Sequence, residues 1–536
     1  MAVAVFVLVP VGIIAGYAVK SLALDASGFN GIAYLARYAI APALFETSML
    51  IAGVLCLTVL IGVTTGWVIA TYRFRGRDIL GWALFLPFAV PTYISAYTYV
   101  EAFDFFGPFQ TLFRYLFGYK ARSSYWFPEV RSLGGAIWIM GLVLYPYIYV
   151  ASRAAFTMQG GNIMDAARSL GCTRFEALRR AVLPVIWPSV AAGSMLVILE
   201  TLNDVGASQY LGVNTFTAAI FNTWLNQGSL PGAAQIALFV LTCVLGLLWL
   251  ERWLRNNRRY TFSSRNYQPA SRPELTGWKM CCACIVCALP VLAGFVLPVS
   301  VLVGSVQKYM VRAEPLADLL SALGNTVMVA TLATVLILAL AMLIAFAERF
   351  SKVERTSLAL RMSTIGYALP GIVLVIGLLP ALGFFDRIIN DVILAAGGSR
   401  IGLVLSGSSV AIVMAYSIRF LAIGVEHVQT GLIAVSRNTD YAAQTLGVQQ
   451  HQVAWRILTP AMRPVITGAS ILIFVDCLKE LPATLLLRPL NFETLATHLY
   501  GQAARGNFES GAVSALFIVA AGLVPLFIMN NVMERK

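Results

Sequence analysis

The sequence predicts an all-α polytopic membrane protein with about 12 transmembrane helices, arranged as two parallel repeats of six. Three observations lead to this fold class. Hydrophobic residues make up 59% of the 536 residues and charged residues only 12%, too few to cover a water-soluble protein of this length. Apolar stretches long enough to cross a bilayer, about 20 residues each, recur along the chain. A constant sequence offset relates the two halves.

The apolar stretches divide evenly between the two halves. In the first half they cover residues 3–22, 43–70, 80–103, 133–155, 189–210 and 233–250. In the second half they cover residues 281–303, 323–346, 362–384, 402–425, 465–487 and 511–532. The fifth stretch of each half is interrupted by charged residues, so these two spans are the first place to look for function.

The distribution of Lys and Arg predicts the orientation. With both termini in the cytoplasm, 24 of the 38 Lys and Arg residues fall on the cytoplasmic side and 12 on the opposite side, while Arg419 and Lys479 lie inside spans. This bias supports an even number of spans with both ends inside. The net charge of +13 therefore follows from membrane topology, and we expect membrane lipid and no nucleic acid as a partner.

The internal repeat is clearest where residues 165–190 align with residues 441–466 at an offset of 276. The offset superposes Gly171 on Gly447 and Pro184 on Pro460. Because each half holds six spans, the repeats share one orientation. We expect a first repeat at 1–255 with a cytoplasmic loop at 157–188, a linker at 256–278, and a second repeat at 279–536 with a loop at 433–464.

Each of these two loops is expected to form a rigid knob of two short helices. In the first loop, Asn162 is the expected N-cap of a helix that stops at Gly171, and a second helix at about 174–182 ends before Pro184. The second loop repeats this plan at Asn438, Gly447 and Pro460. A knob of this kind between two spans is suited to docking on a partner.

The loops resemble a known family. Two adjacent alanines, a glycine five residues after the first, and a later hydrophobic–Pro pair resemble the EAA loop of ABC-importer permeases, whose membrane domains have the type I importer fold. In that family the loop docks on a cytoplasmic ATPase. The resemblance implies that two ATPase copies are coupled through Asp165, Ala166, Ala167, Gly171, Pro184, Ala442, Ala443, Gly447 and Pro460. The acidic first position is Asp165 in one half but Tyr441 in the other, so this contact is expected to differ.

The ATPase is expected to be a separate chain. The sequence contains no Gly-Lys dipeptide and therefore no Walker A motif. We expect a transporter subunit without catalytic residues and without a bound cofactor, because ATP and Mg would sit on the partner ATPase.

Carboxylates inside the fifth spans are candidates for a substrate pathway, because charged side chains in a membrane are costly. The sequence ETLND places Glu200 and Asp204 four residues apart on one helix face, and DCLKE does the same for Asp476 and Glu480. If the two repeats face each other, these four carboxylates would line one pathway in two layers and contact a metal cation transiently.

The residues alone leave an alternative role and several substrates open. Glu200 and Asp476 would instead pair with Lys479 or Arg419, or cap breaks in their helices. Oxygen ligands suit hard cations such as ferric iron. Organic cations such as thiamine or polyamines also pair with carboxylates.

A second resemblance narrows the substrate. The stretches LETLNDVGASQYLGVNTFTAAIFNTW and DCLKELPATLLLRPLNFETLATHLY resemble the fused permeases of periplasmic ferric-iron importers. This implies import of ferric iron by alternating access through a bacterial inner membrane, with delivery by a periplasmic iron-binding protein. Import of thiamine, polyamine or phosphonate is the alternative. A secondary cation transporter without ATPase is a further alternative, but it would have no need of the paired docking loops.

Overall fold

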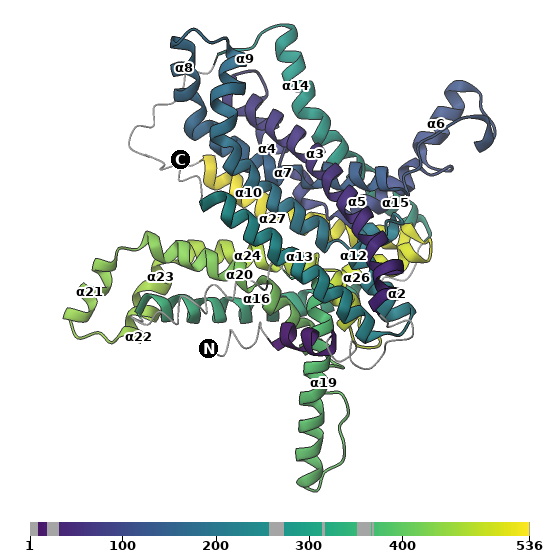
Figure 1. The fold of residues 1–536 in the computed structure, drawn as a ribbon, viewed down its shortest axis with the longest axis vertical. Helices are drawn as coiled ribbons and strands as arrows, with labels where there is room; N and C mark the ends of the chain where they lie inside the picture. The colour runs from purple at the N-terminus through teal and green to yellow at the C-terminus, as the bar shows by residue number, and fades with distance from the viewer. Residues whose placement is uncertain are drawn as a thin grey trace. The chain divides into compact units, whose positions relative to one another are not determined.

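A computed structural model describes residues 9–18, 32–256, 273–312, 317–350, 366 and 369–534. Over these ranges every named element of secondary structure is helical, mostly α-helix with short 3₁₀ and π segments (Figure 1). The predicted all-α fold class is therefore confirmed.

The predicted spans correspond closely to observed helices. Among the described residues, nine helices are long and apolar enough to cross a membrane, and two bent helix pairs raise this number to as many as 11. The bent pairs, with bends of 93° and 76°, correspond to the predicted spans 80–103 and 465–487. The first predicted span is described only over the short helix Val9–Ala18, and the start of the predicted span 362–384 lies outside the described residues.

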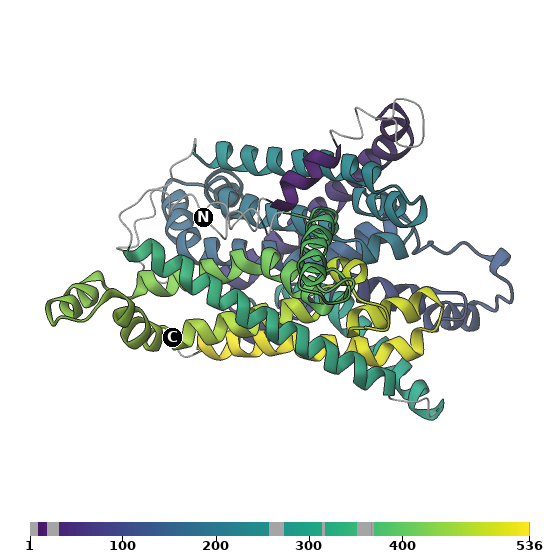
Figure 2. The same ribbon diagram turned by 90° about the horizontal axis from the view of Figure 1, so that it is seen from below.

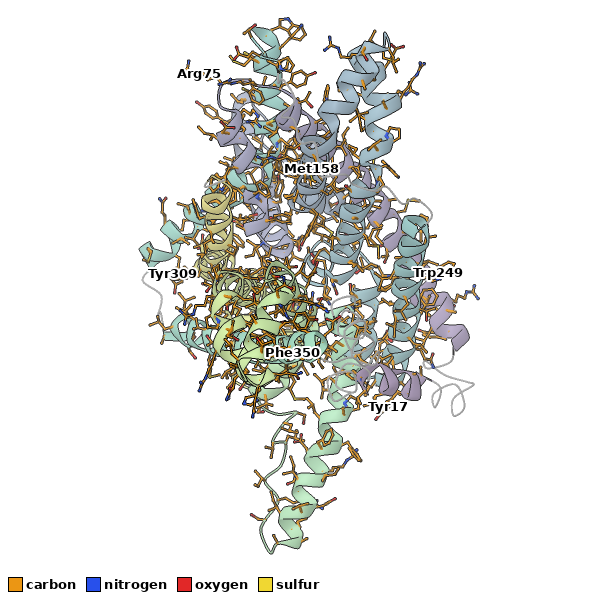
Figure 3. All side chains as sticks on the ribbon, turned by 90° about the vertical axis from the view of Figure 1, so that its left-hand side faces the viewer. Tyr17, Arg75, Met158, Trp249, Tyr309 and Phe350 are labelled. Carbon is orange, nitrogen blue, oxygen red and sulfur yellow. The ribbon has the colours of Figure 1, made fainter. Side chains whose placement is uncertain are left out.

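The helices form two compact units, which are described separately here. Unit 2 comprises residues Ala41–Ala218, Thr242–Ala313 and Ala503–Lys536. Arg75 and Tyr309 lie toward opposite ends of this unit (Figure 3). Its elements are α3 (Ala41–Thr71), α4 (Arg77–Ala83), η2 (Leu86–Ala89), α5 (Thr92–Phe103), α6 (Pro108–Phe117), η3 (Arg122–Ser124), α7 (Leu133–Ala155), η4 (Phe156–Gly160), α8 (Gly161–Ser169), α9 (Arg174–Ala177), η5 (Leu178–Val182), α10 (Leu183–Asn203), α11 (Gly206–Tyr210), α14 (Trp278–Val291), η8 (Leu292–Val296), α15 (Leu297–Arg312) and α27 (Phe508–Glu534).

Unit 1 comprises residues Met1–Ile40, Ala219–Leu241 and Glu314–Gln502. Its elements are α2 (Ile32–Leu35), η1 (Ala36–Ile40), α16 (Ala317–Phe350), α19 (Gly371–Ala395), α20 (Ser409–Ala434), α21 (Arg437–Thr445), α22 (Gln450–Val453), η9 (Ala454–Leu458), α23 (Thr459–Ala461), α24 (Arg463–Leu478) and α25 (Pro482–Leu487). Three stretches extend across the unit boundaries or lie at them: α12 (Phe216–Phe221) with η6 (Asn222–Asn226), α13 (Leu230–Asn256) and α26 (Leu495–Ala504).

Neither unit coincides with one half of the sequence. In unit 1, a Cβ atom at Gly377 of α19 would lie 2.2 Å from the carbonyl oxygen of Pro10, so the first helix of the chain packs against a helix of the second half. In unit 2, a Cβ atom at Gly294 of η8 would lie 2.6 Å from the carbonyl oxygen of Leu142 in α7. Each half thus contributes its first helix to the unit built mainly from the other half. The predicted boundaries at 255 and 279 describe the sequence repeat, not these units.

Close backbone contact joins α3 and α7, which run parallel. Gly62 and Gly66 of α3 are spaced as in the GxxxG motif, in which small residues let two membrane helices approach. A Cβ atom at Gly62 would lie 2.8 Å from the backbone nitrogen of Tyr149. The hydroxyl of Ser152 donates a hydrogen bond of 2.8 Å to the Gly62 carbonyl. The small residues therefore set the distance between the two helices.

In unit 1 the equivalents of α3 and α7 are α16 and α20, and they also make a close contact. Here the glycine lies on α20, the equivalent of α7. Gly424 of α20 faces Ile337 and Ala341 of α16, whose side chains would lie 3.0 and 3.2 Å from an added Cβ atom. Gly424 is the repeat equivalent of Ile148. Both copies of the helix pair thus make a close contact at a glycine, but the glycine lies on α3 in the first copy and on α20 in the second.

Gly62→Ala is expected to destabilise the protein by about 1–3 kcal/mol, because the added methyl group overpacks the contact with α7. Gly246 in α13 is the matched control, since the space around its Cβ position is open. Gly246→Ala should be neutral or stabilising by at most ~1 kcal/mol through helix propensity. Thermal unfolding of the two purified variants tests this, and equal midpoints would contradict the packing role of Gly62.

Candidate functional site

The first loop (157–188) contains the predicted glycine stop but not the predicted N-cap. Helical backbone continues from α7 through η4 into α8, so Asn162 lies inside a helix and the prediction that it caps one is wrong. Gly171 follows α8 with φ of +88°, the left-handed conformation that glycine adopts most readily. Cys172 N–H donates to the carbonyl of Ala167 at 3.1 Å and Gly171 N–H to that of Arg168 at 3.0 Å, which is a Schellman motif.

The second helix of the first loop begins with a capping box. Thr173 N–H donates to Glu176 Oε2 at 3.1 Å, and Glu176 N–H donates back to Thr173 Oγ1 at 3.3 Å. This reciprocal pair satisfies two of the free donors at the start of the helix. The turn between the two helices is therefore fixed on both sides.

The second loop (433–464) is built in the same way, except at its start. Ser436 is the N-cap of α21, since its hydroxyl accepts from the N–H of Asn438, and the prediction that Asn438 caps the helix is wrong. The sequence pattern misled because serine and asparagine are both good caps and lie two residues apart. Gly447 has φ of +79°, and Val448 N–H donates to the carbonyl of Ala443 at 3.1 Å. The two loops thus share one Schellman turn at equivalent positions.

The prolines do not end the helices as predicted. Pro184 lies near the start of α10 within helical backbone that runs without interruption from α9, so the predicted end before Pro184 is wrong. The π segment η5 precedes it, and η9 occupies the equivalent position before Pro460. A wider π turn accommodates a proline that lacks an N–H group. In the second loop the helix bends by 76° shortly afterwards, between Ala461 and Arg463.

Each loop exposes a leucine next to its glycine. Leu170 is 85% exposed and its repeat equivalent Leu446 is 83% exposed, whereas Ala167 and Ala443 are buried against their own units. The alanine preceding each of these is exposed. Figures 1 and 2 both show α21 and α22 projecting beyond the ends of α16 and α20. Each loop therefore offers an apolar anchor at the tip of a fixed turn.

Arg349 holds the second loop against α16. Its Nε donates to Asp440 Oδ2 at 2.6 Å and its Nη2 to Oδ1 at 3.2 Å, and both side chains are buried. The same guanidinium donates to the carbonyls of Leu432 at 2.5 Å and Val435 at 3.0 Å, next to the end of α20. Carbonyls at a helix C-terminus have spare acceptor capacity, which the guanidinium uses here. The planar guanidinium thus joins α16, α20 and α21.

The first loop is held differently. At the offset of 276, Met164 stands where Asp440 stands in the second loop. Arg73, the equivalent of Arg349, is exposed and lies 3.9 Å from Glu274. Arg73 N–H donates to the carbonyl of Pro273, within the predicted linker, at 3.0 Å. The sequence contained a signal of this difference, namely the acid that precedes the alanines by one residue in the first loop and by two in the second.

Two of the predicted pathway carboxylates cap helix breaks. Asp204 follows the end of α10, and its Oδ1 accepts from the N–H of Ala207 at 2.8 Å. Glu480 follows the end of α24, and its Oε1 accepts from the N–H of Ala483 at 3.0 Å. The two bonds are equivalent at the offset of 276. The capping role considered as an alternative for Glu200 and Asp476 is thus found four residues further along each span.

The charges around these carboxylates differ between the repeats. Glu480 also accepts from Arg419 at 2.8 Å, with both side chains buried. Asp204 accepts instead from the hydroxyl of Thr92. Asp476 pairs with Lys479 at 2.7 Å, as the structural alternative predicted. Glu200 is partly buried on α10.

Comparison of the two repeats shows which residues cause this difference in charge. Val143 and Asn203 stand where Arg419 and Lys479 stand in the second half, so both intramembrane cations belong to one repeat. Thr92 was not predicted as a partner of Asp204, because 112 residues separate the two in the chain.

Among the described residues, no three His, Cys, Asp or Glu side chains come together as a metal site.

Comparison with known proteins agrees with this architecture. Residues 58–260 match the family described as the binding-protein-dependent transport system inner membrane component, a range that includes α7, the first loop and α10. Residues 58–260 of this chain are therefore similar to this permease family. The predicted family and its type I importer membrane domains are therefore confirmed.

Relatives of this permease differ in how much of the chain they match. The Fe(3+)-transport system permease protein FbpB 2 of Haemophilus influenzae is 22% identical over 94% of this chain and 92% of its own length. The probable ABC transporter permease protein y4fN of Sinorhizobium fredii is 23% identical over 91% of this chain and 87% of its own. The sulfate transport system permease protein CysT of Salmonella typhimurium is 29% identical, but over 35% of this chain and 66% of its own length. The chain is thus an ABC importer permease and a transporter component.

Arg349→Met is expected to destabilise the second loop by about 3–5 kcal/mol, because it leaves the buried Asp440 carboxylate without its cation. Arg73→Met at the equivalent position removes an exposed ion pair and should cost less than ~1 kcal/mol. Hydrogen–deuterium exchange of peptides covering α21 and α8 measures both effects. Faster exchange is expected in α21 of the first variant alone, and equal exchange in both variants would contradict the role of Arg349.

Proposed function

We propose that this permease imports ferric iron from an external binding protein into the bacterial cytoplasm, driven by two copies of a separate ATPase. The observation that supports ferric iron as the substrate is the match to the Haemophilus influenzae Fe(3+) permease. This match extends over 94% of this chain and therefore includes both repeats. In support, the fifth spans place carboxylates four residues apart at equivalent positions, and oxygen ligands suit ferric iron.

The two loops are the proposed ATPase docking sites. Each combines a Schellman turn with an exposed leucine. The coupling residues named from the family resemblance lie in or just before these turns, except Pro184 and Pro460, which lie further along in α10 and α23. The excess of Lys and Arg on the side of the loops supports a cytoplasmic location for them, with both termini on that side and an inner-membrane setting.

The geometry suggests how a movement of the ATPases would reach the substrate pathway. In the first repeat one helix runs from Phe175, in the loop, to Asn203, the residue before the carboxylate Asp204. A displacement of the first loop would therefore move the end of α10, which Asp204 directly follows. Alternating access follows if the two loops approach and separate as ATP is bound and hydrolysed.

Import of an oxyanion is the second candidate. The sulfate permease of Salmonella typhimurium is 29% identical over one region of this chain, and a molybdenum permease of Haloferax volcanii is 27% identical over 37% of it. In the second repeat, Arg419 and Lys479 pair with Glu480 and Asp476, which reduces the negative charge available to a cation.

Leu170→Asp combined with Leu446→Asp is expected to abolish retention of the ATPase during purification, because a charge replaces the apolar anchor of each loop. Leu490→Asp is the matched control, since Leu490 is 96% exposed but lies outside both loops. Co-purification of the co-expressed ATPase measures the effect. Retention by the double variant, with normal coupling of ATP hydrolysis to uptake, would show that the loops are not the docking sites.

Glu200→Gln combined with Asp476→Asn is expected to lower ferric-iron uptake by on the order of tenfold, the scale of a weakened metal site. Glu493→Gln, which removes a partly exposed partner of Arg488, is the control for charge loss outside the predicted pathway. Uptake of radiolabelled ferric iron, sulfate and molybdate into vesicles holding the permease, ATPase and binding protein measures both substrate and role. Sulfate or molybdate uptake without iron uptake would favour the second candidate, and unchanged iron uptake would remove these carboxylates from the pathway.

A further inference from the structure

The loop between α5 and α7 forms an aromatic arm, defined here as residues 104–131, that no part of the proposed transport cycle uses. Because helical backbone runs from α7 into α8, the aromatic arm and the first loop lie at opposite ends of one helix. Figure 1 shows α6, the helix of the arm, projecting from unit 2 away from α3 and α7. The arm therefore needs a physical account of its own.

One face of α6 fixes the shape of the aromatic arm. Gln110 donates to the carbonyl of Phe103 at 2.8 Å and accepts from the hydroxyl of Tyr125 at 2.6 Å. Arg114 donates to the carbonyl of Phe105 at 2.6 Å and lies 4.0 Å from the centre of its ring. These contacts connect the two ends of the arm to its helix. The arm is therefore a preformed structure that keeps its opposite face outward.

The opposite face of α6 is apolar and exposed. Phe109, Leu112, Tyr115 and Leu116 recur at helical spacing and form one stripe, in which Tyr115 is 85% exposed. Trp126, further along the arm, is 84% exposed. A continuous stripe of large apolar side chains is unfavourable in water, so it indicates a surface that another medium or molecule covers.

Charge identifies the kind of surface. Residues 105–128 contain Arg114, Lys120 and Arg122 and no Asp or Glu, so this part of the arm carries a net charge of +3. Lys120 and Arg122 are exposed. Tyr and Trp together with Lys and Arg beside an apolar stripe are typical of segments that lie in the membrane interface. Anionic lipid headgroups would complement this charge.

Unit 2 has a second exposed apolar surface, on a helix that is able to span the membrane. At the same end of unit 2, α3 begins with the exposed side chains of Leu44, Phe45 and Met49, within a helix apolar enough to span the membrane. The equivalent segment of the second repeat, at the end of α19, is different. Its charges cancel, because it holds Asp386, Arg387, Asp391 and Arg400. The charge argument therefore applies to the first repeat alone.

We propose that the aromatic arm lies in the membrane interface, with its apolar stripe at the boundary of the acyl chains and Lys120 and Arg122 against anionic lipid headgroups. The arm anchors the end of α7 that is remote from the first loop. This proposal depends only on the membrane-spanning fold and is independent of the substrate and the ATPase proposed above.

Tryptophan quenching in lipid nanodiscs tests the proposal. The permease is reconstituted with phosphatidylglycerol and with lipids brominated either near the headgroup or near the bilayer centre. Because the chain has 10 Trp residues, the difference between the wild type and Trp126→Phe isolates the signal of Trp126. Stronger quenching of that signal by the shallow bromines than by the deep ones is expected.

Two further variants make the test specific. Leu112→Gln with Leu116→Gln should abolish most of the Trp126 quenching while leaving the unfolding temperature unchanged, because both side chains are exposed. Lys120→Gln with Arg122→Gln should reduce it in anionic more than in zwitterionic lipid, and Arg387→Gln with Arg400→Gln in the second repeat is the matched control. No quenching of Trp126, or equal quenching in the stripe variant, would overturn the proposal. Shielding of Trp126 from aqueous acrylamide by an added binding protein, without lipid quenching, would overturn it in favour of a protein contact.

Discussion

The requirement that every backbone N–H group find a partner inside a membrane governs this structure. A helix that breaks between apolar neighbours frees donors that no water can reach, at a cost of several kcal/mol each. The fifth span of each repeat is broken, after α10 in the first repeat and after α24 in the second. In both places a carboxylate accepts from the N–H three residues further on. Asp204 and Glu480 are therefore first of all structural, and any part they take in transport builds on helix breaks that they themselves stabilise.

The two repeats solve the same structural problems with different charges. Glu480 is neutralised by Arg419, whereas Asp204 is held by the hydroxyl of Thr92. The second loop is fixed by the buried pair of Arg349 and Asp440. The two loops thus share the π segment before the proline and the Schellman turn, whereas the side chains that balance charge have diverged. Such divergence allows one repeat to interact with substrate or partner differently from the other without changing the fold.

Local patterns were predictable from the sequence, and distant contacts were not. The spans follow from apolar length, and Gly171 and Gly447 follow from the glycine that a left-handed turn requires. The N-cap at Asn438 failed because Ser436 lies two residues earlier, and the one at Asn162 failed because helical backbone continues from α7. The end at Pro184 failed because a π segment accommodates the proline. The exchange of first helices between the units, and the contact of Thr92 with Asp204, join residues far apart in sequence. Periodicity and motif spacing contain no information about such contacts.

A loop can transmit movement to a span either through an unbroken helix or through a rigid side-chain connection, and this chain contains both kinds of connection. In the first repeat the helix from Phe175 to Asn203 is continuous and needs no further support. In the second repeat the helix bends by 76° between Ala461 and Arg463, which would dissipate a push along its axis. There Arg349 ties α21 to α16 and to the end of α20 instead. The buried ion pair occurs in the repeat whose helix is bent, so the asymmetry of charge compensates an asymmetry of the backbone.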